Sequence, residues 1–110
     1  MILLYVASDG IGHGSDELGK ILLPAYMGVF SRGEVVPDVI AFVNGGVKLL
    51  TEDSIAIDAL RVLDQRGVKI LACGTCLDYF DLTDKLAVGA PTNAAELTQM
   101  MLTADKVIKV

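Results

Sequence analysis

Short apolar runs recur along the chain and predict the strands of a β-sheet. They are continuous rather than alternating, which is typical of strands buried on both faces of a parallel sheet. The predicted strands are Ile2–Ala7, Asp38–Val43, Lys69–Ala72, Leu86–Val88 and Asp105–Val110.

Apolar residues at helical spacing predict a first helix after residue 14. Ser15 can cap this helix, and Asp16 and Glu17 suit the positive end of its dipole. Pro24 should kink the helix or restart it. One apolar stripe is formed by Leu18, Ile21, Leu22, Ala25, Tyr26, Val29 and Phe30.

Two further helices and a shorter helical segment are predicted between the remaining strands. One helix is capped by Thr51 or Ser54 and runs to Arg66, where Gly67 stops it. Residues 77–86 form a short helix or two turns. Asn93, with a glutamate three residues on, resembles a capping box for a helix to about residue 103.

Strands and helices alternate throughout, which predicts an α/β fold with a mostly parallel five-stranded sheet, right-handed crossovers and helices on both faces. The chain of 110 residues is long enough for one domain, residues 1–110, but not for two.

The composition is apolar for a chain with no membrane span. Hydrophobic residues make up 53%, and the mean hydropathy is +0.55. No run approaches the roughly 18 apolar residues of a transmembrane helix, and no secretion signal is recognisable. We therefore expect no membrane association, a covered sheet, and surface that is buried in a homo-oligomer.

Charge and cysteine content narrow the function classes further. The formal net charge of −5 argues against nucleic acid as a partner, because phosphate binding needs a basic stripe. Two cysteines three residues apart provide no disulfide framework, so a reducing cytoplasm is the expected compartment.

The cysteines themselves are the strongest chemical signal. Cys73-Gly74-Thr75-Cys76 follows the apolar run 68–72, so the thiols should lie at the carboxyl end of a buried strand, where ligands collect in α/β sheets. Unpaired N–H groups there should lower the thiol pKa. Nearby aspartates oppose this effect, and Lys48 offsets them if it reaches across. We favour reactive thiols over buried packing residues.

The first three strands should end at one edge of the sheet and bring their loops together. The first loop is the glycine-rich segment 8–14, and the second is 44–46 with a lysine at 48. Glycine is common in any tight turn, so only the added cysteines make this arrangement resemble a site. The candidate substrate-binding or anion-binding positions are Ser8, Asp9, Gly12, Gly14, Asn44, Gly45, Gly46, Lys48, Gly74 and Thr75.

Cofactor motifs are weak. The glycine spacing fits neither the dinucleotide nor the P-loop pattern, and Asp16 and Glu17 would repel phosphate. Two cysteines and the single His13 are too few for a structural zinc site. We expect neither a metal nor an organic cofactor, a solvated His13, and a packing role for Tyr79 and Phe80.

Several further segments follow one another in order and span nearly the whole chain. They are Ser8-Asp9 with Gly12 and Gly14, Asp16–Gly19, Phe42–Leu49, Ile70–Asp78, Asp84–Gly89 and Ala104–Ile108. Together they resemble the DsrE-like sulfurtransferases, most closely the carboxy-terminal domain of YedF proteins, which are linked to selenium metabolism. The resemblance implies a three-layer flavodoxin-like sandwich that assembles as a trimer or hexamer.

The resemblance also implies chemistry. Family members that relay sulfur carry it as a persulfide on a cysteine at the position of Cys73, and Cys76 belongs to a C-x-x-C variant. YedF proteins usually place a small SirA/TusA-like domain ahead of this one, whereas this chain begins at the first strand. Such a domain is an expected partner, as persulfide donor or acceptor.

The leading hypothesis is persulfide relay, with Cys73 as the carrier and Cys76 able to resolve the persulfide as a disulfide. Two alternatives stay open. A non-catalytic oligomeric interaction subunit would have unreactive thiols. A dithiol–disulfide oxidoreductase is less well supported, because no long helix is predicted to follow the cysteines.

Overall fold

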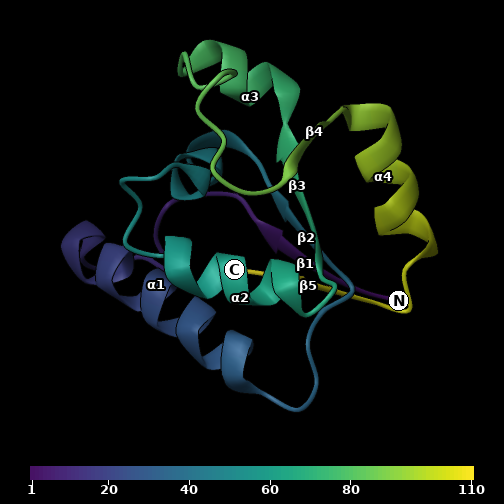
Figure 1. Ribbon diagram of the computed structural model, residues 1–110, viewed down its shortest axis with the longest axis horizontal. Helices are drawn as coiled ribbons and strands as arrows, with labels where there is room; N and C mark the ends of the chain where they lie inside the picture. Colours follow the sequence, from purple (N-terminus) through teal and green to yellow (C-terminus); the bar gives the residue numbers. More distant parts are fainter.

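The computed structural model describes residues 1–110, and a single parallel sheet of five strands lies at its centre. Its order is β4-β3-β2-β1-β5 (Figure 1). The strands are β1 (Ile2–Val6), β2 (Val39–Phe42), β3 (Lys69–Cys73), β4 (Ala90–Thr92) and β5 (Lys106–Lys109). The predicted α/β sandwich is confirmed. Its strand order puts β5 outside β1, where flavodoxin itself has its second strand.

Helices cover both faces of the sheet, as predicted. The helices α1 (Asp16–Arg32) and α2 (Ile57–Gln65) lie on one face, over a core of 18 buried residues. The helix α4 (Ala94–Thr103) lies on the other face, where five buried residues form a smaller core. From β1 to β4 the chain adds each strand on the same side of the sheet, but β5 pairs with β1 at the other edge. Because the connection from β4 to β5 runs in the reverse direction, a right-handed crossover places α4 on the face opposite to α1 and α2.

Two short helices stand at the carboxyl end of the strands, which is the upper part of Figure 1. The 3₁₀ helix η1 (Asn44–Leu50) follows β2 directly, and α3 (Gly74–Tyr79) follows β3 directly. No helix of the structure is both long and apolar enough to cross a lipid bilayer.

The fourth strand was predicted in the wrong place. Leu86–Val88 lies outside any strand, and β4 is formed by Ala90–Thr92 instead. Val88 is apolar because it packs into the main core, whereas the residues of β4 pair with Leu71–Cys73 at an edge of the sheet. The apolar pattern at this point indicates burial, not strand pairing.

The apolar stripe predicted for α1 is largely its outer face. The side chains of Ile21 and Val29 are 60% and 63% exposed, while Leu23 and Met27 are fully buried. Ser15 caps the helix as predicted, and its hydroxyl oxygen accepts the N–H of Leu18. The helix runs as one element through Pro24, so the predicted restart is wrong.

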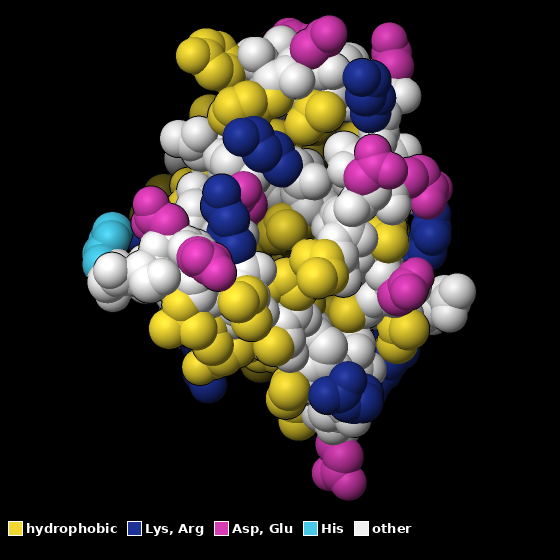
Figure 2. Space-filling view, turned by 90° about the vertical axis from the view of Figure 1, so that its left-hand side faces the viewer, with side chains coloured by type: hydrophobic (Ala, Val, Ile, Leu, Met, Phe, Trp, Pro, Cys, Tyr) yellow, Lys and Arg dark blue, Asp and Glu magenta, His cyan; other side chains and the backbone are white.

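Figure 2 views the side of the molecule on which α1 begins. In the lower half of this view, hydrophobic side chains gather below a band of charged groups. The exposed hydrophobic residues of α1 are Leu18, Ile21, Tyr26 and Val29.

The second predicted helix starts later than its candidate caps suggested. α2 begins at Ile57, and the hydroxyl of Ser54 binds the N–H of Ala56 in the turn before it. The cap of α4 was predicted correctly, because the Asn93 side chain accepts the N–H of Glu96 at 2.9 Å.

Candidate functional site

Cys73 is the last residue of β3 and the N-cap of α3, because the chain enters the helix without an intervening loop. Its sulfur accepts a hydrogen bond from the backbone N–H of Cys76 at 3.3 Å. The predicted position at the carboxyl end of a strand is confirmed. The short turn holds the thiol in a fixed place at the top of the sheet.

Cys76 lies one helical turn further on, where its sulfur accepts the backbone N–H of Asn44 at 3.1 Å. Asn44 is the first residue of η1 and has φ of +49°, a conformation that asparagine tolerates better than most residues. The ends of β2 and β3 are therefore joined through a sulfur atom, as expected for loops that share one edge of the sheet.

The pKa of Cys76 is raised, contrary to the expectation that strand-end amides would lower it. Burial is the main cause, and a hydrogen bond with the Cys73 side chain raises the pKa further. The N–H of Asn44 acts in the opposite direction but does not outweigh these effects. Burial therefore favours the protonated form of the Cys76 thiol.

The two cysteines line different pockets. Cys73 lines a pocket of about 430 Å³ between the sheet and α4, which we call the Cys73 pocket. Cys76 lines a pocket of about 490 Å³ with Asn44, Tyr79 and Phe80, which we call the Cys76 pocket. The sequence did not indicate that these two neighbouring cysteines would line separate pockets.

The Cys73 pocket also draws residues from α4 and its cap that the sequence analysis missed. Thr92 is the direct neighbour of Cys73 across the β3–β4 pairing, and its hydroxyl donates to Glu96 at 2.8 Å. Asn93 and Thr98 line the same pocket. Only the strand order, which a single sequence does not reveal, brings these residues beside the thiol.

Lys48 lies over the ring of Phe80, with its Nζ 4.4 Å from the ring centroid. Tyr79 stacks edge-on against Phe80 at 5.1 Å, and 82% of the Tyr79 side chain is exposed. Tyr79 is therefore not a packing residue, in contrast to the prediction. The aromatic pair lines the Cys76 pocket, and the lysine contacts this pair through the ring of Phe80.

The glycine-rich loop forms a hollow of its own. Ser8, Asp9 and Gly12 line a cavity of about 350 Å³ at the start of α1, and none of them lines a cysteine pocket. His13 lines the same hollow and is exposed. Gly14 is exposed as well and has φ of +129°.

The second loop links this hollow to the cysteines. A side chain at Gly45 would meet Asp9, and one at Gly46 would come within 2.5 Å of the carbonyl oxygen of Val6. Gly46 therefore allows η1 to pack directly on β1. Of the other predicted positions, Gly74 and Thr75 line the Cys73 pocket, and Thr75 also lines the Cys76 pocket.

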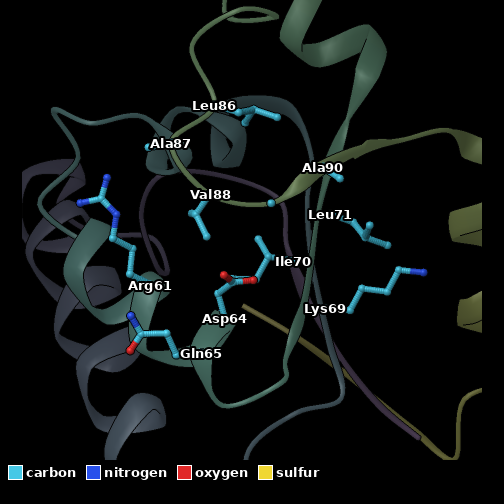
Figure 3. A pocket seen from close by; sticks show the side chains of 11 residues that line it. Arg61, Asp64, Gln65, Lys69, Ile70, Leu71, Leu86, Ala87, Val88 and Ala90 are labelled. Carbon is cyan, nitrogen blue, oxygen red and sulfur yellow. The ribbon is translucent and has the colours of Figure 1, made fainter.

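The largest hollow of the surface lies away from the thiols. It measures about 680 Å³ and lies between α2 and the edge of β3, with Asp64 and Val88 directed into it (Figure 3). Lys69 points away on the other side of the strand. The hollow is lined by no thiol or hydroxyl side chain, so we place the candidate site at the cysteines. No group of three His, Cys, Asp or Glu side chains is arranged to hold a metal ion.

Solved structures with this architecture cover almost the entire chain. The YchN protein of E. coli matches with 21% identity and a TM-score of 0.66, covering 100% of both chains. Protein MTH1491 of Methanobacterium thermoautotrophicum, of unknown function, matches with 18% identity and a TM-score of 0.73 over 99% of this chain and 97% of that one. Protein BT1422 of Bacteroides thetaiotaomicron, also of unknown function, matches with 17% identity and a TM-score of 0.61, covering 98% and 94%.

At these identities the likeness establishes the fold alone. No curated protein is similar enough in sequence to count as a relative. The sequence pattern of one family does match, over residues 17–110, which include both cysteines and every strand after β1. The chain belongs to the DsrE/DsrF-like family.

Proposed function

We propose that this domain relays sulfur by carrying it as a persulfide on Cys73. The Cys73 thiolate attacks the outer sulfur of a donor persulfide, R–S–SH. A bond forms between the Cys73 sulfur and that outer sulfur, while the bond to the donor breaks and R–S⁻ leaves. An acceptor thiolate later removes the outer sulfur in the same way and restores Cys73.

The observation that supports this proposal most directly is the asymmetry of the two thiols. The Cys73 sulfur accepts the N–H of Cys76 at the start of α3, whereas burial raises the pKa of the Cys76 thiol. A backbone N–H directed at the Cys73 sulfur stabilises the charge that develops there when the persulfide bond breaks, as an oxyanion hole does for oxygen. Cys73 is therefore the nucleophile in our proposal. Membership of the DsrE/DsrF-like family agrees with sulfur chemistry.

The rival function, a non-catalytic subunit of an oligomer, has one observation in its favour. The exposed apolar residues of α1 would be covered if copies of the chain assembled through this helix. Assembly and sulfur relay are compatible, so we include a homo-oligomer in the proposal. Dithiol–disulfide exchange is less favoured, because α3 has six residues and offers only a short helix after Cys73.

The cargo and the partners follow from the YedF resemblance. Selenium undergoes the same displacement as sulfur, so a selenium-bearing donor belongs to the proposal as a second substrate class. A SirA/TusA-like domain is the proposed protein partner, because its thiol would exchange the outer atom with Cys73.

The test is the intact mass after incubation with a persulfide donor. Wild type, Cys73→Ser and Cys76→Ser are compared, each with its folding checked by circular dichroism. The proposal expects a gain of one sulfur atom in the wild type and in Cys76→Ser, and none in Cys73→Ser. If no variant gains sulfur and both thiols stay unreactive in the folded protein, the relay is wrong and the interaction subunit takes its place.

A further inference from the structure

The two sulfur atoms are neighbours, yet each faces its own pocket. The backbone N–H of Cys76 binds the Cys73 sulfur at 3.3 Å, but the Cys73 pocket lies toward α4 and the Cys76 pocket lies toward η1. Val43 and Thr75 are the only residues that line both pockets. These two residues therefore lie between the pockets, and each pocket has one of the thiols in its lining.

We propose that sulfur enters through the Cys73 pocket, passes from Cys73 to Cys76, and leaves through the Cys76 pocket. This inference rests on the proposed function and adds a direction to it. The donor and the acceptor then use different sides of α3, so both can be bound at the same time and neither must leave before the other arrives.

The passage from one thiol to the other balances without an oxidant or a reductant. The Cys76 sulfur attacks the outer sulfur of Cys73–S–SH, a bond forms to Cys76, and the bond from Cys73 to the outer sulfur breaks. The products are Cys76–S–SH and Cys73–SH, so the thiol proton of Cys76 ends on Cys73. The bond from the N–H of Cys76 to the Cys73 sulfur, at 3.3 Å, holds the two residues together for this transfer.

The two pockets differ in the polarity and exposure of their linings, and this difference agrees with entry at Cys73 and exit at Cys76. No charged side chain lines the Cys73 pocket, which presents the hydroxyls of Thr92 and Thr98 beside apolar side chains. It suits a small, uncharged persulfide end. The Cys76 pocket is bounded by the exposed Tyr79 and by Phe80 beneath Lys48. An exposed tyrosine next to a cation–aromatic pair suits contact with the surface of an acceptor protein.

The direction can be tested by blocking one pocket. Thr98 is an exposed residue of α4 that lines the Cys73 pocket, so Thr98→Trp should fill it without disturbing the core. Gln99→Trp is the matched control, because Gln99 is exposed on the same helix and lines neither cysteine pocket. Loading from the persulfide of N-acetylcysteine amide should slow about tenfold or more in Thr98→Trp. It should be unchanged in Gln99→Trp.

Discharge gives the decisive comparison. Once loaded, Thr98→Trp should pass sulfur to 2-mercaptoethanol at the wild-type rate, because the sulfur leaves from Cys76 on the other side. Adding Cys76→Ser to Thr98→Trp should slow discharge about tenfold, since the remaining exit is the blocked one. In the wild type, fragmentation of the quenched peptide should locate the extra sulfur first on Cys73 and later on Cys76.

Three results would overturn the direction while leaving Cys73 as a carrier. Thr98→Trp could slow loading and discharge equally, which would mean that a single pocket serves both. The sulfur could remain on Cys73 until discharge. Release of one sulfide for each Cys73–Cys76 disulfide formed would show that Cys76 attacks the inner sulfur of the Cys73 persulfide instead of the outer one. A wild type that never gains sulfur on Cys73 would overturn the proposed function itself.

Discussion

Replacement of Gly46 by alanine should destabilise the domain, whereas the same change at the neighbouring Gly45 should not. The new Cβ at Gly46 would lie 2.5 Å from the carbonyl oxygen of Val6, and this neighbour is backbone that cannot rotate away. At Gly45 the nearest atom, the backbone nitrogen of Asp9, is 3.7 Å away, which is an ordinary contact. The two variants therefore differ in one steric clash.

The size of the effect follows from these distances. To regain the separation of about 3.5 Å at which nonbonded atoms attract, η1 must move away from β1 by about 1 Å. Overpacking of this kind costs about 1–3 kcal/mol. Replacing glycine by alanine stabilises a compatible site by about 0.4–1 kcal/mol, through the unfolded chain. Gly46→Ala should thus lose up to about 2.6 kcal/mol, and Gly45→Ala should gain slightly.

Urea unfolding measures both variants directly, and the midpoint of Gly46→Ala should be the lower one. Movement of η1 also lengthens the contact from the N–H of Asn44 to Cys76, so this amide should exchange its hydrogen faster in Gly46→Ala than in Gly45→Ala. If Gly46→Ala is as stable as Gly45→Ala, η1 does not pack directly on β1.

The remaining predictions concern the thiols, α1 and α4. Alkylation of Cys76 should occur at higher pH than alkylation of a free cysteine, because the pKa of Cys76 is raised. Cys73→Ala should shift the alkylation profile of Cys76 to lower pH, because it removes the hydrogen bond with the Cys73 side chain that raises this pKa. An unchanged profile would contradict that hydrogen bond. The folded state holds the thiol proton of Cys76 more tightly than the unfolded state does, so the free energy of unfolding should fall as the pH rises above 9.0, the ordinary pKa of a cysteine. The midpoint of urea unfolding should show this fall in the wild type, and Cys76→Ser should reduce it. In urea unfolding, Leu23→Ala should cost about 2–5 kcal/mol and Ile21→Ala under about 1 kcal/mol; equal costs would mean that the faces of α1 are misassigned. Asn93→Ala should cost about 1 kcal/mol through the lost cap and lower the melting temperature by about 4–8 °C; an unchanged melting curve would show that the cap contributes nothing.

Local signals in the sequence predicted much of the fold. Ser15 and Asn93 start their helices where they were expected to, because a cap depends only on a few neighbouring residues. The buried strands could be predicted because a short continuous apolar run is typical of a strand that is covered on both faces. β4 was misplaced for the same reason, since Val88 is buried without belonging to a strand.

The inner face of α1 depends on shape more than on hydrophobicity. Gly19 is buried because α1 approaches the glycine-rich loop closely, and a Cβ there would lie 2.9 Å from the carbonyl oxygen of Ile11. Ser31 is buried as well, with its hydroxyl bound to the carbonyl of Gly28. The outer face of the helix is the more apolar one, so periodicity alone selected the wrong side.

Only those parts of the candidate site that depend on a single strand could be predicted from the sequence. The end of β3 places Cys73, and this was readable from the residues before it. Thr92 reaches the same pocket because β4 is the neighbour of β3, and Tyr79 is exposed because α3 ends there. Both facts arise from the tertiary arrangement and leave no mark in the local pattern.

The two outer strands bear on how this apolar chain avoids aggregation. β4 has only three residues and contains Pro91, which lacks an N–H group. β5 begins and ends with the exposed lysines Lys106 and Lys109. Short strands, prolines and lysines at sheet edges hinder the pairing of strands between molecules, which is the first step toward amyloid-like fibres. The sheet is therefore protected against strand pairing at both of its edges.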